Sequence, residues 1–342
     1  MWKKLAMSAL ATALGLLLLN TAAFLGELVA YGTWYADGQP AGLYDNEPGE
    51  RPRLKPGARL DGLRYSIHVN STGFRGPELR DPPPDDALRL WCVGGSTTFD
   101  IYAPDDASAW PAVAGRHLQE ALPDRTVEVV NAGIPGEILF GSNEDLRDLG
   151  RHIRPDVVVI YHGPNDLRQV LTRPEEPTPL LPIPINPALL RVASRTLQGS
   201  SHLQVQMPPR TVSARDLQPI RQRLLTLIET IQAVGAQPLL ATHALRWPDD
   251  ATGEQARDLV AESVVLLQMD PPSVIKAFAA YNDLVSQLAR ERRLPLADVR
   301  AAVSTAPENW GDATHFRAPG SATAGKVIAD AVIDAGLHRR TR

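Results

Sequence analysis

The sequence predicts an α/β protein built on a parallel sheet of about five strands. Three apolar segments are typical of buried strands, each ends in a glycine-containing loop, and stretches of helical period separate them. These strands are expected at residues 88–93, 127–131 and 156–161, and their loops at 94–98, 132–137 and 162–166. Strand–helix–strand connections make such strands parallel and bring their loops to one edge of the sheet. Open α/β sheets bind ligands at that edge, so the candidate site lies there.

The remaining elements follow in order along the chain. A short edge strand is expected at 64–70, before the first buried strand. Two more strands are expected at 238–242 and 295–299, with helices at 107–122, 142–152, 217–234, 274–292 and 321–335.

The N-terminus predicts a membrane anchor that precedes the folded domain. Lys3 and Lys4 come before an apolar run from Leu5 to Leu25, which is long enough to cross a bilayer at about 20 residues. No lysine or arginine occurs between Glu27 and Glu50, so the lysines are expected in the cytoplasm and the rest of the chain outside it. A cleaved signal peptide ending near 21–23 is the alternative, and both interpretations export the domain.

These features divide the chain into three parts. We expect an anchor or signal peptide at residues 1–36, a linker at 37–62 and a catalytic domain at 63–338. The linker prediction is based on a Gly-, Pro- and charge-rich composition without apolar period. A Pro-rich insertion at about 171–212 interrupts the domain and is interpreted either as a lid or binding wall, or as a spacer.

Composition excludes several classes of function. The 342 residues are 44% hydrophobic and 22% charged, with a formal net charge of -4, so no basic field favours nucleic acid as a partner. Cys92 is the single cysteine, which rules out an intrachain disulfide, and it is interpreted as a buried core thiol. No His/Cys/Asp cluster has the spacing of zinc ligands, and the loop at 94–98 lacks a phosphate-binding lysine. The sequence thus predicts neither a metal nor a cofactor.

Two short motifs suggest a divided Ser/His/Asp site. Gly94 and Gly95 allow a tight turn that leaves Ser96 exposed at the sheet edge, where its hydroxyl could act as a nucleophile. Far along the chain, the spacing of Asp312 and His315 lets the carboxylate orient the imidazole that takes the serine proton. Each motif alone also fits a plain turn or a helix cap.

Four motifs in this order resemble the SGNH hydrolases, also called GDSL-type esterases. The matching segments are 94–96, 131–136, 163–166 and 312–315, and the lead-in at 70–78 is similar to that of membrane-anchored bacterial members. The resemblance implies a flavodoxin-like three-layer α/β/α sandwich. It also implies that Ser96, Asp312 and His315 are catalytic, and that Ser96, Gly136 and Asn165 form the oxyanion hole.

The sequence departs from this family at two positions. Gly95 stands where the name motif has aspartate, and Asp100 stands where glycine is frequent. An ordering role of the missing aspartate therefore cannot be carried over, and Asp100 is expected to alter the mouth of the pocket.

The expected function is a serine esterase that works through an acyl-enzyme. We expect it to remove O-acetyl or other short acyl groups from a small-molecule or glycan ester outside the cytoplasm. Two alternatives stay open: an O-acyltransferase acting on envelope polysaccharide, which would use the same residues, and a non-catalytic binding module of the same fold. The intact serine, histidine and aspartate argue against the binding module. The sequence predicts no particular protein partner.

Overall fold

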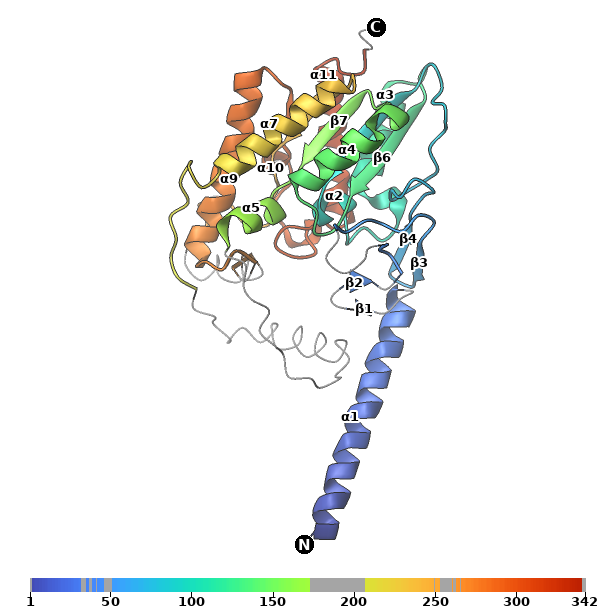
Figure 1. Cartoon of the computed structure of the whole chain (residues 1–342), viewed down its shortest axis with the longest axis vertical. Coiled ribbons are helices and arrows are strands. Elements are labelled where there is room, and N and C mark those ends of the chain that lie inside the picture. Colours follow the sequence, from blue (N-terminus) through green and yellow to red (C-terminus); the bar gives the residue numbers. More distant parts are fainter. Residues whose placement is uncertain are drawn as a thin grey trace.

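The centre of the fold is a five-stranded parallel sheet in the order β6-β5-β7-β8-β9 (Figure 1). The strands are β5 (Leu88–Gly94), β6 (Val127–Gly133), β7 (Val157–Tyr161), β8 (Gln237–Ala241) and β9 (Leu296–Ala297). In this computed structural model the described residues are 2–31, 51–172, 207–248 and 266–339, with short stretches between 35 and 45 and between 250 and 264. The strand order is that of flavodoxin-like folds, so the predicted parallel sheet is confirmed.

Helices cover both faces of this sheet, which gives the predicted three layers. The helices α4 (Leu139–Ile153), α7 (Gln218–Ala233) and α9 (Pro271–Arg292) pack on one face, and α3 (Trp110–Ala121) and α11 (Ala318–Asp334) on the other. Side chains alternate along a strand, so Trp91 and Val93 of β5 face the first group while Leu90 and Cys92 face the second. Both faces are buried, which explains why β5 is apolar at nearly every position, with the buried Arg89 as the exception.

Several short helices were not predicted from the sequence. α2 (Ser96–Phe99) and α5 (Pro164–Leu171) begin directly in the loops after β5 and β7. The predicted helix at 107–122 consists of a 3-10 turn, η1 (Asp106–Ser108), followed by α3. Two further short elements of the described residues are α10 (Val299–Ala302) and η2 (Pro307–Asn309). α2 has four residues and α5 eight, so neither shows the long apolar period that marks a helix in sequence.

The N-terminal apolar run forms one long helix, α1 (Trp2–Tyr31), which projects away from the domain (Figure 1). Residues Leu10–Ala30 have a mean hydropathy of 1.8 and none of this span is buried against the rest of the protein. The helix is therefore long and apolar enough to cross a membrane, a property that it shares with signal sequences.

The segment predicted as a linker contains folded and buried residues. Leu43, Leu54 and Leu60 are at most 3% exposed and belong to a small apolar cluster that also holds Phe99 of α2. Isolated leucines without a period give no strand or helix signal in sequence, yet together they fill the space beside α2. Packed structure thus begins before residue 63. Of the predicted insertion at 171–212, residues 173–206 lie outside the described residues.

The predicted edge strand forms, but it is not part of the main sheet. β4 (Tyr65–His68) pairs antiparallel with β3 (Arg59–Gly62) in a separate hairpin. The short strands β1 (Tyr35–Ala36) and β2 (Gln39–Pro40) form a second antiparallel pair. A backbone bridge between Arg75 and Asn131 of β6 joins the lead-in to the main sheet, and Phe74 packs against Trp91 of β5.

Candidate active site

The candidate nucleophile lies in a very tight strand-to-helix turn. Ser96 is the first residue of α2 and follows β5 after a single intervening residue, Gly95. A Cβ atom at Gly94 would clash with the Thr98 side chain of α2 and with the Tyr161 carbonyl oxygen at the end of β7, so only glycine allows α2 to approach the sheet edge this closely. The Ser96 side chain is partly exposed at that edge, as predicted.

Ser96, His315 and Asp312 form a continuous chain of hydrogen bonds. The Ser96 Oγ and His315 Nε2 atoms are 2.7 Å apart, and His315 Nδ1 is 2.7 Å from Asp312 Oδ2. An ionised carboxylate only accepts hydrogen bonds, so His315 Nδ1 carries the proton and Nε2 is left to accept from the serine hydroxyl. The structure therefore brings together three residues that are 219 positions apart at most.

A closed turn holds the aspartate and the histidine in this geometry. Trp310 and Phe316 form an antiparallel bridge, and Asp312 Oδ1 accepts from the backbone N–H groups of Thr314 and His315, at 2.9 Å each. Burial opposes ionisation of Asp312, but the charge of His315 and these hydrogen bonds outweigh it and hold the pKa of the carboxyl below its usual range. Asp312 is therefore charged at neutral pH.

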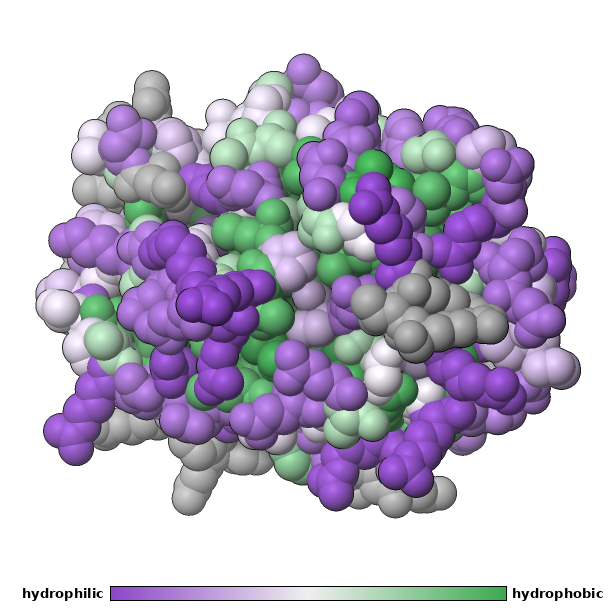
Figure 2. Space-filling view, turned by 90° about the horizontal axis from the view of Figure 1, so that it is seen from above, coloured by the Kyte–Doolittle hydropathy of each residue, from purple (hydrophilic) through white to green (hydrophobic). Residues whose placement is uncertain are grey.

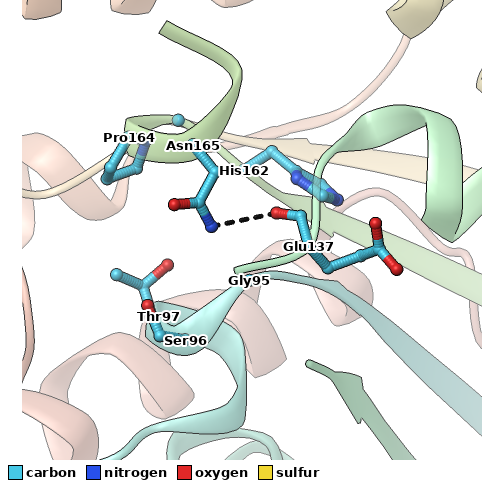
Figure 3. A pocket seen from close by; sticks show the side chains of 8 residues that line it. Gly95, Ser96, Thr97, Glu137, His162, Pro164 and Asn165 are labelled. Atoms are coloured by element: carbon cyan, nitrogen blue, oxygen red, sulfur yellow. Dashed lines mark hydrogen bonds between the residues drawn. The ribbon is translucent and has the colours of Figure 1, made fainter. Parts of the chain in front are cut away.

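Asn165 faces the serine from the other side of a small hollow (Figure 3). Its Nδ2 donates to the Glu137 carbonyl oxygen at 3.0 Å. An amide nitrogen carries two hydrogens, so this bond orients the group and leaves a second hydrogen to donate. A Cβ atom at position 95 would lie 2.7 Å from Nδ2, so Gly95 makes room for the Asn165 amide where the family's name motif has aspartate.

Gly136 is the third residue that sequence motifs assign to oxyanion binding. It has a φ of +89°, which favours glycine, and it precedes Glu137 in the loop after β6. Gly136 itself is not among the residues that line the hollow, whereas Glu137 is. The loop is thus placed beside the serine, but the structure does not bring Gly136 into the hollow.

A second Ser/His/Asp set lies buried behind this hollow and was missed in the sequence. His162 Nε2 is 3.0 Å from Ser142 Oγ, and His162 Nδ1 is 3.1 Å from Asp166 Oδ2. All three residues are at most 2% exposed. Asp166 also accepts from the Leu139 N–H at 3.0 Å, which ties α5 to the start of α4. This set therefore links the two segments that carry Asn165 and Glu137. Of its three residues only Asp166 lies in one of the matched motifs, the segment 163–166.

Arg51, from the segment predicted as a linker, binds the loop after β6 that carries Gly136 and Glu137. Its guanidinium donates to Glu137 Oε2 at 2.9 Å, to the Gly141 carbonyl at 2.7 Å, and to Asp145. Burial raises the pKa of the Glu137 carboxyl even though Arg51 opposes the shift. No local pattern identifies a pair of residues 86 positions apart, so sequence reasoning had no signal for it.

Arg75 supports the α2 turn and is 2% exposed. It donates to Asp106 Oδ1 at 2.8 Å and to the carbonyl oxygens of Phe99 and Asp100, at 2.8 and 3.0 Å. Asp100 has a φ of +66°, which explains why glycine suits this position. Asp100 is buried and accepts from the Trp110 N–H at 2.8 Å, so it caps α3 and does not line the hollow.

Replacing Arg75 with methionine should destabilise the domain by about 3–5 kcal/mol, because Asp106 and two buried carbonyl groups lose their donor. Chemical denaturation monitored by tryptophan fluorescence measures the free energy of unfolding. Arg53→Met is the matched control: the Arg53–Asp148 pair is 60% and 62% exposed with an N–O distance of 3.9 Å, so about 1 kcal/mol or less is expected. Equal losses in the two variants would show that Arg75 contributes no more than a surface pair.

One aromatic side chain flanks the histidine on the solvent side. The Tyr102 ring meets the His315 ring edge-on, with centroids 6.0 Å apart, and Tyr102 is 43% exposed. In the part of the chain that the structure describes, no group of three or more His, Cys, Asp or Glu residues is placed to bind a metal ion.

A serine, a histidine and an ionised aspartate in hydrogen-bond contact, at the carboxyl edge of a parallel sheet, define a serine-hydrolase type of site. The chain belongs to the GDSL-like lipase/acylhydrolase family, whose model matches residues 92–322. It is therefore an enzyme that hydrolyses ester bonds. No curated protein matches the sequence.

Several solved structures are similar in fold. A lipase/acylhydrolase from Enterococcus faecalis has 16% sequence identity and a TM-score of 0.42, over 72% of this chain and 96% of that one. An α/β hydrolase from the metagenome of Lake Arreo, Spain, has 16% identity and a TM-score of 0.44, over 74% and 97%. An acetyl xylan esterase has 17% identity and a TM-score of 0.42, over 72% and 99%.

Proposed function

We propose that the protein is a membrane-anchored serine esterase that removes short acyl groups from an ester outside the cytoplasm. The single observation that carries the proposal is the hydrogen-bond chain from Ser96 Oγ through His315 to Asp312, with 2.7 Å at each of its two steps. Family membership supports ester hydrolysis as the reaction, and the hydrogen-bond chain supports Ser96, His315 and Asp312 as the residues that carry it out.

The chemistry follows from the positions of these groups. His315 Nε2 takes the proton of Ser96 as Oγ attacks the ester carbonyl, and it then gives that proton to the departing alcohol. Water repeats the sequence and releases the acid, which restores the serine. Asp312 stabilises the imidazolium that forms in each half-reaction.

Stabilisation of the oxyanion is assigned to the Ser96 and Gly136 N–H groups and the Asn165 amide. The support for Asn165 is its placement opposite Ser96 (Figure 3) and its fixed orientation through Glu137. The support for Gly136 is its place in the loop that Glu137 and Arg51 hold beside the hollow.

Little enclosed space lies beside the serine. The enclosed part of the hollow has a volume of about 10 Å³, and Thr97, His162 and Pro164 are among the residues that line it. Pockets for drug-sized ligands span about 300–1,000 Å³, so the small size of this hollow supports an acetyl or similarly small group.

The location is inferred from charge. Lys3 and Lys4 precede the apolar span, and Arg51 is the next basic residue in the sequence. The positive-inside rule then places the lysines in the cytoplasm and the domain on the other side of the membrane. Protease treatment of intact spheroplasts tests this: the domain should be digested, and full protection would contradict the proposal.

The activity is tested on the full-length protein in detergent, with p-nitrophenyl esters of increasing acyl length. We expect kcat/KM to be highest for acetyl or propionyl esters and to fall as the acyl chain lengthens. A polysaccharide acceptor added to the same assay distinguishes hydrolysis from transfer, since transfer would place the acyl group on the sugar. Preference for long acyl chains would contradict the proposed substrate class.

Replacing Asn165 with alanine should lower kcat about 10²–10³-fold, because one oxyanion donor is lost. The variant should remain folded, because the Asn165 side chain is partly exposed and donates to a single carbonyl oxygen, that of Glu137. Steady-state kinetics on an acetyl ester and a thermal unfolding curve measure both quantities. An unchanged kcat would remove Asn165 from the mechanism.

A further inference from the structure

The C-terminal end of α1 is joined directly to the turn between β3 and β4. The Leu63 N–H donates to the Val29 carbonyl oxygen and the Arg64 N–H donates to the Ala30 carbonyl oxygen, each at 3.0 Å. The last carbonyl groups of a helix have no partner within the helix, so the hairpin turn satisfies two of them. The end of the apolar helix and the hairpin turn are thus one structural unit.

Hydrogen bonds continue from this hairpin to the serine turn. Within β4, the Ser66 N–H donates to the Pro104 carbonyl at 2.8 Å and the His68 N–H donates to Asp106 Oδ2 at 3.0 Å. Asp106 is the partner of Arg75, which binds the carbonyl oxygens of Phe99 and Asp100 at the end of α2. A chain of hydrogen bonds therefore connects the end of α1 to α2, the helix that begins at Ser96.

The turn of the β3–β4 hairpin exposes the apolar side chain of Leu63 beside the C-terminal end of the apolar span of α1. Leu63 is 84% exposed, and Arg64 beside it is exposed as well. The span Leu10–Ala30 has 21 residues, which at 1.5 Å per residue is about 31 Å and matches a hydrocarbon core of about 30 Å. With α1 in a bilayer, Val29 and Ala30 reach the interface, and the backbone bonds place Leu63 at the same depth.

We propose that the Leu63–Arg64 turn inserts into the headgroup region of the bilayer and holds the active-site edge of the sheet toward the membrane surface. The enzyme would then act on esters presented at that surface. Leu63 would contact the acyl boundary, and the Arg64 guanidinium would bind lipid phosphate. This inference rests on the proposed membrane anchorage.

The arrangement of the domain agrees with this orientation. Figure 1 shows α2 and α5, which carry Ser96 and Asn165, at the same end of the sheet as the β3–β4 hairpin and α1. Figure 2 shows the molecule from the opposite end, where hydrophilic side chains make up most of the surface. The polar end would face water, and the end with the site would face the bilayer.

The test uses the full chain in vesicles of phosphatidylethanolamine and phosphatidylglycerol, with a polarity-sensitive nitrobenzoxadiazole probe on Leu63→Cys. Cys92 is fully buried, and burial raises the pKa of its thiol, so labelling is directed to the introduced cysteine. The matched control is Glu120→Cys, an exposed position on α3. The two probes report the depth of two positions in the same protein.

We expect the probe at position 63 to shift to shorter wavelength, to lose quenching by aqueous iodide and to be quenched by spin-labelled lipid. The probe at position 120 should stay accessible to iodide. Equal iodide access at both positions, in protein that floats with the vesicles, would overturn the inference and leave the anchor intact. Failure to float would instead refute the anchorage on which the inference rests.

An activity measurement adds a second, independent readout. Leu63→Ser keeps both backbone hydrogen bonds, because they come from N–H groups, and it removes only the apolar contact. Its kcat/KM on a soluble acetyl ester should equal that of the unmodified enzyme, while its rate on an ester embedded in vesicles should fall. Equal rates of the two proteins on the embedded ester would contradict a role of Leu63 at the surface.

Discussion

Replacing Ser96 with alanine should reduce ester hydrolysis by about 10⁴-fold or more. The hydroxyl is the group that His315 contacts at 2.7 Å, and without it no acyl-enzyme can form. Any residual rate would come from water that attacks an ester already held by the oxyanion donors. The measurement is kcat/KM on an acetyl ester, together with labelling by a fluorophosphonate, which should modify the original protein at Ser96 and leave the variant unlabelled.

The buried set behind the hollow supplies the matched control. Ser142 also contacts a histidine that contacts an aspartate, with distances of 3.0 and 3.1 Å, but it is 2% exposed. A substrate cannot reach it, so Ser142→Ala should lose far less activity than Ser96→Ala and should affect mainly the free energy of unfolding. If Ser142→Ala abolished activity and Ser96→Ala did not, the assignment of the nucleophile would be wrong.

The central sheet was predictable because its strands are buried on both faces. A run such as that of β5 is apolar at nearly every position, and glycine at its end marks the turn. The β3–β4 hairpin and the packed leucines before it were not predictable in the same way. Leu43 and Leu54 belong to a cluster that is completed by distant residues, among them Phe99 of α2, and single apolar residues carry no period.

The candidate site also has parts that the sequence predicts and parts that it does not. Ser96, Asn165, Asp312 and His315 belong to short motifs in a fixed order, and the structure brings all four to the sheet edge. Arg51 and the Ser142–His162–Asp166 set support those motifs. His162 and Asp166 are 4 positions apart, but Ser142 contacts His162 across 20 positions and Arg51 contacts Glu137 across 86. The two longer contacts depend on how strands and helices pack, so no local spacing predicts them.

Replacing Asp312 with asparagine should lower kcat by about 10⁴-fold while the turn stays folded. The amide oxygen can still accept from the Thr314 and His315 backbone N–H groups, as Oδ1 does now. The amide nitrogen, however, donates where Oδ2 accepts, so His315 Nδ1 must lose its proton and Nε2 must carry it. A protonated Nε2 cannot accept the proton of Ser96, so the serine is no longer activated.

The pH dependence follows from the same contacts. Burial alone would raise the pKa of Asp312. The charge of His315 and the hydrogen bonds from the backbone lower this pKa by more than burial raises it, so the net shift is downward. The carboxylate thus stays charged as the pH falls, so acid inactivation is not expected to arise from protonation of Asp312. ¹⁵N chemical shifts of the imidazole distinguish the two tautomers, and they should show the proton on Nδ1 in the original enzyme and on Nε2 in Asp312→Asn.

Asp330→Asn makes the same chemical change in an exposed pair with Lys326 and should leave kcat unaltered. Asp312→Ala should lose a similar amount of kcat and, in addition, stability, because both backbone N–H groups then lose their acceptor. Wild-type kcat in Asp312→Asn, with the proton still on His315 Nδ1, would mean that another group orients the imidazole. The comparison of the asparagine and alanine variants therefore separates the control of the tautomer from the support of the turn.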